Sequence, residues 1–297
     1  MRLGAMLLTA DVGNDAAFLK DMAQSLEGSG FDGVLTNDHV VGAHPDRQRP
    51  GEKVHTYDVP CHEPLVFLTF LGAVTTRLEL ATSIVISTQR QTVLLAKQAA
   101  EVDLLTGGRL RLGVGIGRNW MEYEVLEQDF SNRGRRLEEQ VQVLRLLWTE
   151  ELVTFDGNWH HLDRIGLNPL PAQRPIPIWM GSFVGNIVEK VLERTGRLAD
   201  GWMPQFPPGD QLADALNRLR GYAADAGRNP NALGIECGMR IGTGDDPQLW
   251  VDTAAAYKSL GATHLRVSTV GGGYSTPDEH LAAWIQWINT ISPVARS

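Results

Sequence analysis

The chain has 297 residues, of which 43% are hydrophobic and 21% charged, a composition typical of a globular protein. Its formal net charge of −8 offers no basic face for nucleic acid, and no apolar run approaches the roughly 18 residues of a membrane span. The cysteines, Cys61 and Cys237, lie far apart and suggest neither a disulfide framework nor a zinc site. Since the start of the chain lacks the long apolar core of a signal peptide, we expect a cytoplasmic protein.

Short apolar runs alternate along the chain with longer segments of helical periodicity. The expected strands are Arg2–Ala10, Phe31–Asn37, Leu78–Ile86, the glycine-rich run that ends at Gly117, Ile176–Gly181, Asp200–Met203, Leu233–Ile241 and His264–Val270. The expected helices are Asp15–Gly28, Glu63–Val74, Thr92–Leu105, Trp120–Leu126, Arg133–Thr149, Val184–Thr195, Gly209–Ala226, Pro247–Leu260 and Pro277–Ile291. Eight strand–helix units predict an α/β protein with the (β/α)8 TIM-barrel fold, and a doubly wound open sheet is the alternative.

Two segments depart from this alternation. Val40–Pro60 is a long polar stretch, and loops of that length in a compact domain are usually functional or disordered. Within Glu150–Gln173, two short strand-like runs flank Asp156-Gly157, which predicts a small hairpin. We therefore expect a single domain over residues 1–297, with a hairpin insertion at about 150–173 after the fourth helix.

The glycine-rich run has a period of two. Apolar residues at 110, 112, 114 and 116 alternate with Arg111, Gly113, Gly115 and Gly117, which predicts a buried strand. Because glycine has no Cβ, the alternating glycines would let a ligand lie directly on the backbone at the strand exit. The spacing is G-x-G-x-G and not the G-x-G-x-x-G of a dinucleotide fold, so a Rossmann domain is the weaker interpretation.

In a TIM barrel the active face is formed by the carboxyl ends of the strands. The expected strand ends carry a neutral, glycine-rich and aromatic set of residues: Asp38-His39, Thr82–Ile84, Gly115–Asn119, Met180–Ser182 and Trp202-Met203. Neither a His-x-His after the first strand nor a carboxylate cluster is present in the sequence. We therefore expect no metal site, which argues against a binuclear hydrolase of this fold.

Several motifs in this order and spacing resemble the luciferase-like monooxygenase superfamily, and within it the coenzyme F420-dependent oxidoreductases. They are Asn37–Val40, Leu94–Ala100, Leu105–Gly117, Asp129–Leu137, Leu144–Trp148, Thr154–Gly157, Leu170–Gly181 and Ala199–Trp202. The resemblance covers nearly the whole chain. It implies a TIM barrel, usually a homodimer, that holds a flavin or deazaflavin at the strand ends, with the hairpin as the family's usual insertion.

The resemblance also implies roles for individual residues. His39 would be the catalytic residue beside the reactive ring, although a strand-end histidine bonded to backbone is the plainer alternative. A non-proline cis peptide bond is expected at Ser83–Ile84, where a bulge would support the ring, and the loop from Gly181 would hold the cofactor phosphate at a helix N-terminus. The expected cofactor-binding residues are Asp38, Ser83, Ile84, Val85, Gly115, Gly117, Asn119, Gly181, Ser182, Gly185 and Asn186.

Arg118 departs from one branch of the family. The F420-dependent sugar-phosphate dehydrogenases carry a glutamate there as acid or base, and arginine cannot release a proton near neutral pH. We therefore expect no oxidation of glucose 6-phosphate, and His39 without a carboxylate partner of that kind. Arg118 would hold an anionic substrate group or lie on the rim. His44 and Cys61 are further candidate substrate contacts, with a structural role for Cys61 as the alternative.

Together these features predict hydride transfer between coenzyme F420 and a small organic substrate, with reduction of an activated C=C, C=N or C=O bond as the expected direction. His39 would carry the accompanying proton, and the segment Val40–Pro60 would close over the substrate. Two alternatives remain open. One is an FMN-dependent monooxygenase supplied by a flavin or F420 reductase partner, and the other is a non-catalytic carrier of the cofactor.

Overall fold

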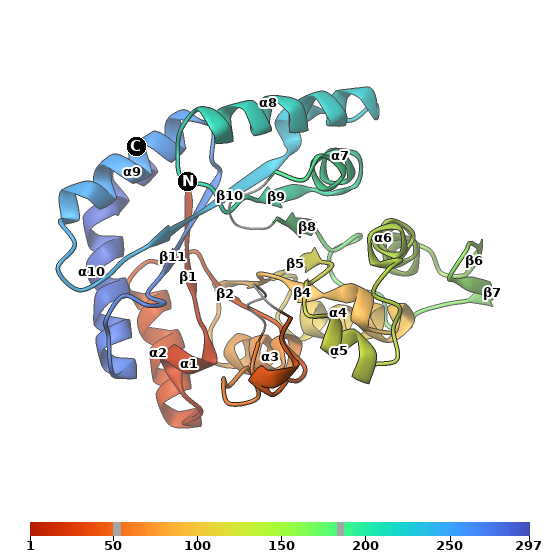
Figure 1. The fold of residues 1–297 in the computed structure, drawn as a ribbon, viewed down its shortest axis with the longest axis horizontal. Coiled ribbons are helices and arrows are strands. Elements are labelled where there is room, and N and C mark those ends of the chain that lie inside the picture. The colour runs from red at the N-terminus through yellow and green to blue at the C-terminus, as the bar shows by residue number, and fades with distance from the viewer. Residues whose placement is uncertain (50–54, 183–186) are drawn as a thin grey trace.

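The computed structural model describes residues 1–49, 55–182 and 187–297, and it forms a closed barrel of parallel strands with helices outside (Figure 1). The strand order is β3-β2-β1-β11-β10-β9-β8-β5-β4, and a further pairing of β3 with β5 closes the sheet. Since β3 and β4 both pair with β5, they are two parts of one barrel strand and the described sheet has eight positions. The TIM-barrel prediction is confirmed, and the open sheet is excluded.

The barrel strands are β1 (Arg2–Met6), β2 (Gly33–Thr36), β3 (Glu79–Thr82), β4 (Val85–Ile86), β5 (Leu110–Gly115), β8 (Ile178–Gly181), β9 (Gly201–Met203), β10 (Gly234–Arg240) and β11 (His264–Ser268). The helices are α1 (Thr9–Val12), α2 (Ala16–Gly28), α3 (Pro64–Val74), α4 (Thr92–Leu105), α5 (Trp120–Val125), α6 (Arg133–Thr149), α7 (Glu189–Leu198), α8 (Asp210–Asp225), α9 (Pro247–Ser259) and α10 (Pro277–Arg296). The antiparallel hairpin of β6 (Val153–Asp156) and β7 (His161–Ile165) follows α6 and projects from the barrel (Figure 1).

Sequence signals at the helix ends explain most helix positions. The Asp15 side chain accepts the Phe18 amide at 2.7 Å and begins α2, and Thr276 and Glu279 form a capping box ahead of α10. The bounds of α4 and α6 agree with the predicted ones. The N-terminal amino group donates to the Ala295 carbonyl at 2.7 Å, so the two ends of the chain lie together.

The amino-terminal end of the barrel interior is closed by a buried charge network. Arg111 has a side chain that is 6% exposed and donates to Glu79 at 2.6 Å and to the buried carboxylate of Glu236. Its guanidinium also lies 4.3 Å from the ring centroid of Trp179. Since burial of a charge is costly without partners, this pairing is what permits an arginine on an inward-facing strand position.

Two strands in the first third of the chain differ from the predicted ones. The first strand ends at Met6 because Thr9–Val12 turns into the short helix α1. The predicted strand Leu78–Ile86 is interrupted between Thr82 and Val85, where the Ser83–Ile84 peptide bond is cis.

Later boundaries differ because of tertiary contacts. The hairpin turn spans 157–160 and not Asp156-Gly157 alone, because the Glu139 carboxylate holds the amides of Asn158, Trp159 and His160, each at 2.8 Å. Helix α7 begins at Glu189, after the non-helical Ile187 and Val188, while 184–186 of the predicted range lie outside the described residues. Helix α10 continues past Ile291 to Arg296, through Pro293, since Lys258 donates to the Val294 carbonyl and holds the last turn.

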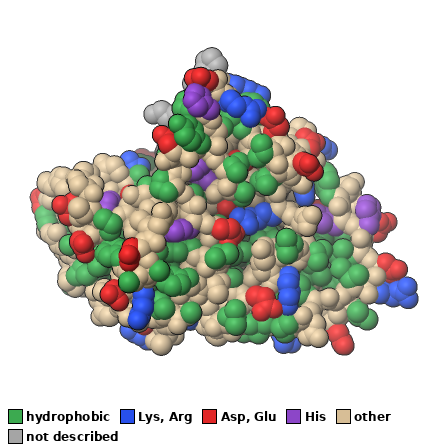
Figure 2. All heavy atoms as spheres, turned by 90° about the horizontal axis from the view of Figure 1, so that it is seen from below, with side chains coloured by type: hydrophobic (Ala, Val, Ile, Leu, Met, Phe, Trp, Pro, Cys, Tyr) green, Lys and Arg blue, Asp and Glu red, His purple; other side chains and the backbone are tan. Residues whose placement is uncertain are grey.

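Acidic and basic side chains are interspersed over the face seen in Figure 2. Among the described residues, no helix is both long and apolar enough to span a membrane.

Candidate functional site

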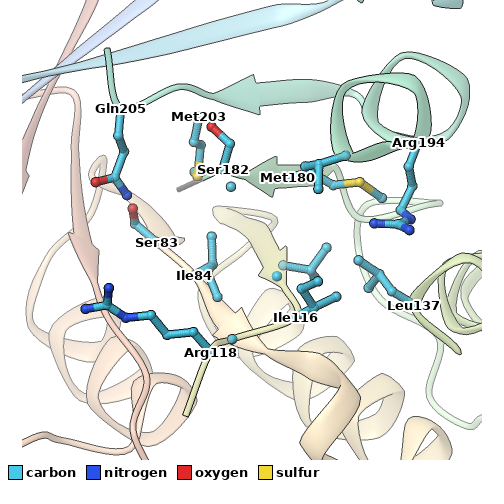
Figure 3. Close-up of a pocket in the computed structure, with 15 residues that line it drawn as sticks. Ser83, Ile84, Ile116, Arg118, Leu137, Met180, Ser182, Arg194, Met203 and Gln205 are labelled. Atoms are coloured by element: carbon cyan, nitrogen blue, oxygen red, sulfur yellow. The ribbon is translucent and has the colours of Figure 1, made fainter. Parts of the chain in front are cut away.

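A cavity of about 300 Å³ opens at the carboxyl ends of the strands, and its volume is at the lower end of the range for small-molecule sites. Its walls come mainly from β5, β8 and the bulge between β3 and β4 (Figure 3). It is lined by Ser83, Ile84, Val114, Gly115, Ile116, Gly117, Arg118, Leu137, Met180, Gly181, Ser182, Val191, Arg194, Met203 and Gln205. Seven of the residues predicted from the sequence are among them: Ser83, Ile84, Gly115, Gly117, Arg118, Gly181 and Ser182.

The bulge in the third barrel strand places Ile84 in the middle of the cavity wall. The predicted cis peptide bond at Ser83–Ile84 is present. A Cβ added to Gly115 would lie 2.6 Å from Cδ1 of Ile84, and one added to Gly181 would lie 2.8 Å from its Cγ2. The Ile84 side chain therefore packs directly against both glycines, and any larger residue there would displace it. Both glycines line the cavity, and the expectation that their backbone contacts a ligand stays a prediction.

Polar groups lie at opposite sides of this largely apolar cavity. Figure 3 shows Arg118 and Arg194 on opposite sides, with Ile84 and Ile116 between them. Arg194 is 7% exposed and its Nε donates to Glu138 at 2.9 Å. Arg118 is exposed and has no ion pair among the described residues. The Ser182 hydroxyl is buried and has no hydrogen-bond partner in the described part of the chain.

His39 follows β2 at the carboxyl end of the barrel and is not among the residues that line the cavity. Its Nδ1 is 3.2 Å from Oε2 of Glu122, a carboxylate that is 1% exposed and also accepts the Val40 amide at 3.0 Å. Position 118 offers His39 no carboxylate, but Glu122 of α5 gives it a carboxylate partner of another kind, one that contacts Nδ1. A carboxylate bonded to Nδ1 favours the tautomer that carries its proton there, and Nε2 has no hydrogen-bond partner among the described residues.

Sequence reasoning missed Glu122 for a physical reason. Glu122 stands three residues after Asn119, the N-cap of α5, and this spacing is the ordinary capping-box pattern. In the structure, Asn119 caps α5 as predicted by accepting the Met121 amide at 3.3 Å, while Glu122 turns toward His39 instead. Only the three-dimensional approach of β2 and α5 reveals this use.

Asp38 supports the bulge and does not line the cavity. One carboxylate oxygen accepts from Arg90 and the other from the Ile86 amide, both at 2.8 Å. Burial raises the pKa of Asp38, and the positive charge of Arg90 opposes the rise. With both oxygens engaged, Asp38 ties the end of β2 to β4, and its direct contact with a cofactor stays a prediction.

The other predicted residues lie away from the cavity or outside the described residues. Val85 is buried in β4 and pairs with Val114, and Gly185 and Asn186 lie outside the described residues. His44 is exposed, caps a short 3₁₀ turn at Pro45–Arg47 and stacks on Tyr57 at 5.8 Å. Burial raises the pKa of the Cys61 thiol to about 11, so beside His39 it is a neutral thiol and not a thiolate.

Comparison with known proteins agrees with this geometry. Residues 1–286 match the family described as luciferase-like monooxygenase. The chain belongs to the luciferase-like monooxygenase family. The membership predicted from its motifs is thereby confirmed.

Individual luciferase-like relatives have more specific names. An uncharacterised protein of Mycobacterium tuberculosis is 31% identical over 226 residues, which cover 74% of this chain and 76% of that one. An F420-dependent glucose-6-phosphate dehydrogenase of Gordonia bronchialis is 28% identical over 277 residues, covering 90% and 76%. The structure of an F420-dependent secondary alcohol dehydrogenase with an F420–acetone adduct has a TM-score of 0.79 at 17% identity, covering 100% and 99%.

Proposed function

We propose that the protein transfers a hydride between coenzyme F420 and a small organic substrate, and that His39 carries the accompanying proton. The observation that supports this most is the pairing of His39 Nδ1 with the buried Glu122 carboxylate, directly after β2 at the active end of the barrel. The similarity to F420-dependent enzymes supports the choice of coenzyme. Reduction of an activated C=C, C=N or C=O bond is the direction we propose.

The residues at the cavity fit a flat ring with a polar tail. Ile84, Ile116 and Met203 offer apolar contact, and the Ser182 hydroxyl is a buried group that still lacks a partner among the described residues. When bound, the deazaflavin would supply the hydride donor or acceptor. The bulge at Ser83–Ile84 and the backbone of Gly115 and Gly181 would orient its ring.

The chain itself would supply the proton and the positioning. The Glu122 carboxylate would accept a hydrogen bond from Nδ1–H, so that proton exchange takes place at Nε2. In the imidazolium form Nε2 would give its proton to the substrate, and in the neutral form it would take one. The positive charge that develops on the imidazole would be stabilised by Glu122, as in other carboxylate–histidine pairs. Much of the rate acceleration would come from holding the coenzyme and the substrate in a fixed relative orientation.

We propose that Arg118 makes the protein prefer substrates that carry a negative charge. It is a cation at the cavity mouth with no ion-pair partner in the described part of the chain, which favours a substrate with a carboxylate or phosphate group. Because arginine does not release its proton, this role is binding and not acid–base chemistry. Oxidation of glucose 6-phosphate, the activity in the name of the Gordonia relative, remains disfavoured for the same reason.

An FMN-dependent monooxygenase fed by a reductase partner is the second candidate, since the family is named for monooxygenases. Anaerobic oxidation of reduced F420 by 2-cyclohexen-1-one and by acetone tests the first candidate, and oxygen uptake with reduced FMN tests the second. We expect turnover with reduced F420, and a loss of about 10²–10⁴-fold in His39→Ala, the range of general acid–base catalysis. Oxygen uptake without F420 turnover would select the monooxygenase, and tight binding without any turnover would select the carrier.

A further inference from the structure

A second histidine, His55, lies flat on His39. The two imidazole rings are parallel within 2°, and their centroids are 4.1 Å apart. His55 comes from the long segment between β2 and α3, sixteen residues further along the chain, and is about half-buried. Nothing in its sequence context singles it out as a site residue.

The backbone around His55 holds it in this position. The Ala43 amide donates to the His55 carbonyl at 3.2 Å, and the Tyr57 amide donates to the Ala43 carbonyl at 3.3 Å. These two bonds join the described ends of the segment to each other. At Gly42 a Cβ would collide with the backbone of Thr56, so the close approach requires glycine there. The position of His55 is therefore set by main-chain pairing, independently of its contact with His39.

The stack limits how a substrate can reach His39. Glu122 occupies Nδ1, and His55 covers one face of the ring. A substrate is thus directed to the Nε2 edge, in the plane of the imidazole, where a proton can be transferred.

His55 itself remains neutral near pH 7. Burial, and next the neighbouring His39, lower its pKa, while the charges of Glu122 and Asp58 and a backbone hydrogen bond with Val59 act in the opposite direction. Two adjacent imidazoles cannot both be charged at low cost. Glu122 contacts His39 and His55 stacks on it as a neutral ring, so the contribution of His55 is steric.

We propose that His55 is a positioning residue of the active site, which holds the His39 ring in the orientation that pairs Nδ1 with Glu122 and leaves Nε2 for the substrate. The catalytic consequence rests on the proposed function, whereas the orientation of His39 does not. His44 offers a matched comparison. It is a histidine of the same segment that stacks on Tyr57, but it has no contact with His39.

The test uses the full chain and observes His39 directly. Long-range ¹H–¹⁵N spectra of the uniformly labelled protein identify the protonated ring nitrogen, with His39→Ala providing the assignment. We expect the Nδ1–H tautomer in the wild type, in His55→Phe (which keeps a flat ring) and in His44→Ala, and a mixture of tautomers in His55→Ala. His55→Leu retains bulk without a flat ring and repeats the test should alanine unfold the protein. An unchanged tautomer in both disruptive variants, or an equal change in His44→Ala, would overturn the proposal.

Kinetics provides the second readout. With reduced F420 and 2-cyclohexen-1-one, we expect kcat to fall about tenfold or more in His55→Leu, with F420 affinity within twofold, because a misplaced catalytic group costs rate and not cofactor binding. His55→Phe should recover most of the rate. Loss of F420 affinity with unchanged kcat would count against positioning. If no variant, including the wild type, turns over F420, the proposed function fails, and the tautomer measurement still decides the role of His55.

Discussion

The two ends of the barrel interior are built from the same strands but differ in whether their buried polar groups have partners. At the amino-terminal end, Arg111 is paired with Glu79 and Glu236, and Arg266 lies 3.9 Å from Glu236. At the carboxyl end, the Ser182 hydroxyl and the Asn119 side-chain nitrogen are buried without partners among the described residues. The first arrangement stabilises the fold, and we propose that the second leaves the Ser182 hydroxyl for a ligand.

Removing one member of the paired network should produce the largest effect. Glu236→Ala leaves the buried Arg111 with Glu79 alone, and we expect a loss of about 3–5 kcal/mol in the free energy of unfolding. Urea denaturation measures it. Glu124→Ala, which breaks the exposed pair with Arg47, is the control and should cost about 0–1 kcal/mol. Equal losses for the two variants would contradict the contrast between buried and exposed pairs.

Lowering the pH should reduce the free energy of unfolding through His264, which lies at the same end of the barrel. Burial, then the charge of Arg111, lower the pKa of His264 to about 4, while Glu79 and Glu236 act in the opposite direction and Arg2 lowers it further. A histidine whose pKa is lower in the folded state than in the unfolded state favours folding above about pH 6.5, where it is neutral in both states. This contribution to the free energy of unfolding is lost as the pH falls toward 4, by roughly 3 kcal/mol in total.

The measurement is the free energy of unfolding at pH 7 and pH 4.5 for the wild type and His264→Asn. We expect the wild type to lose more stability on acidification than the variant does. If the two lose the same amount, His264 does not titrate in the way that its surroundings indicate.

At the cavity mouth, Arg118→Ala should change binding and not stability. We expect KM to rise about tenfold for an enone that carries a carboxylate, because a charge-assisted hydrogen bond is lost, and to stay unchanged for 2-cyclohexen-1-one. The free energy of unfolding should change by less than about 0.5 kcal/mol. A similar rise for both acceptors would remove Arg118 as a determinant of substrate charge.

The smallest effect is expected for Ser182→Ala. Its hydroxyl has no partner to lose among the described residues, so stability should change by less than about 0.5 kcal/mol, whereas F420 affinity should fall by about two- to tenfold. Thermal unfolding and fluorescence titration measure the two quantities. A destabilisation above 1 kcal/mol would mean that the hydroxyl is used within the fold.

The fold could be predicted from sequence because its signals are local and repeated. The apolar periodicity of Thr92–Leu105 and Arg133–Thr149 gave the observed helix bounds, and eight strand–helix units point to few architectures. The predicted element boundaries were wrong where contacts with residues distant in sequence set the observed ones. Glu139 sets the hairpin turn, and contacts with Lys258 and Met1 extend the last helix.

The site was harder to predict because its residues act through partners from other elements. The sequence predicted the cavity-lining glycines, but their close packing against Ile84 follows from the bulge in a neighbouring strand. Asp38 was assigned to the cofactor, and its carboxylate is engaged by Arg90 and Ile86. Glu122 and His55 carry no sequence signal beyond a helix cap and a loop histidine. Their proximity to His39 exists only in the folded chain.

The central claim is that the carboxyl end of the barrel binds a deazaflavin in the cavity around Ile84. Equilibrium fluorescence titration with F420 and with FMN tests it, using the wild type, Ser182→Trp to fill the cavity, and Ser259→Trp on the exposed end of α9 as the control. We predict that F420 binds at least about tenfold more tightly than FMN, a preference of about 1.4 kcal/mol, and that only Ser182→Trp abolishes binding. Tighter binding of FMN, or full F420 affinity in Ser182→Trp, would contradict the claim.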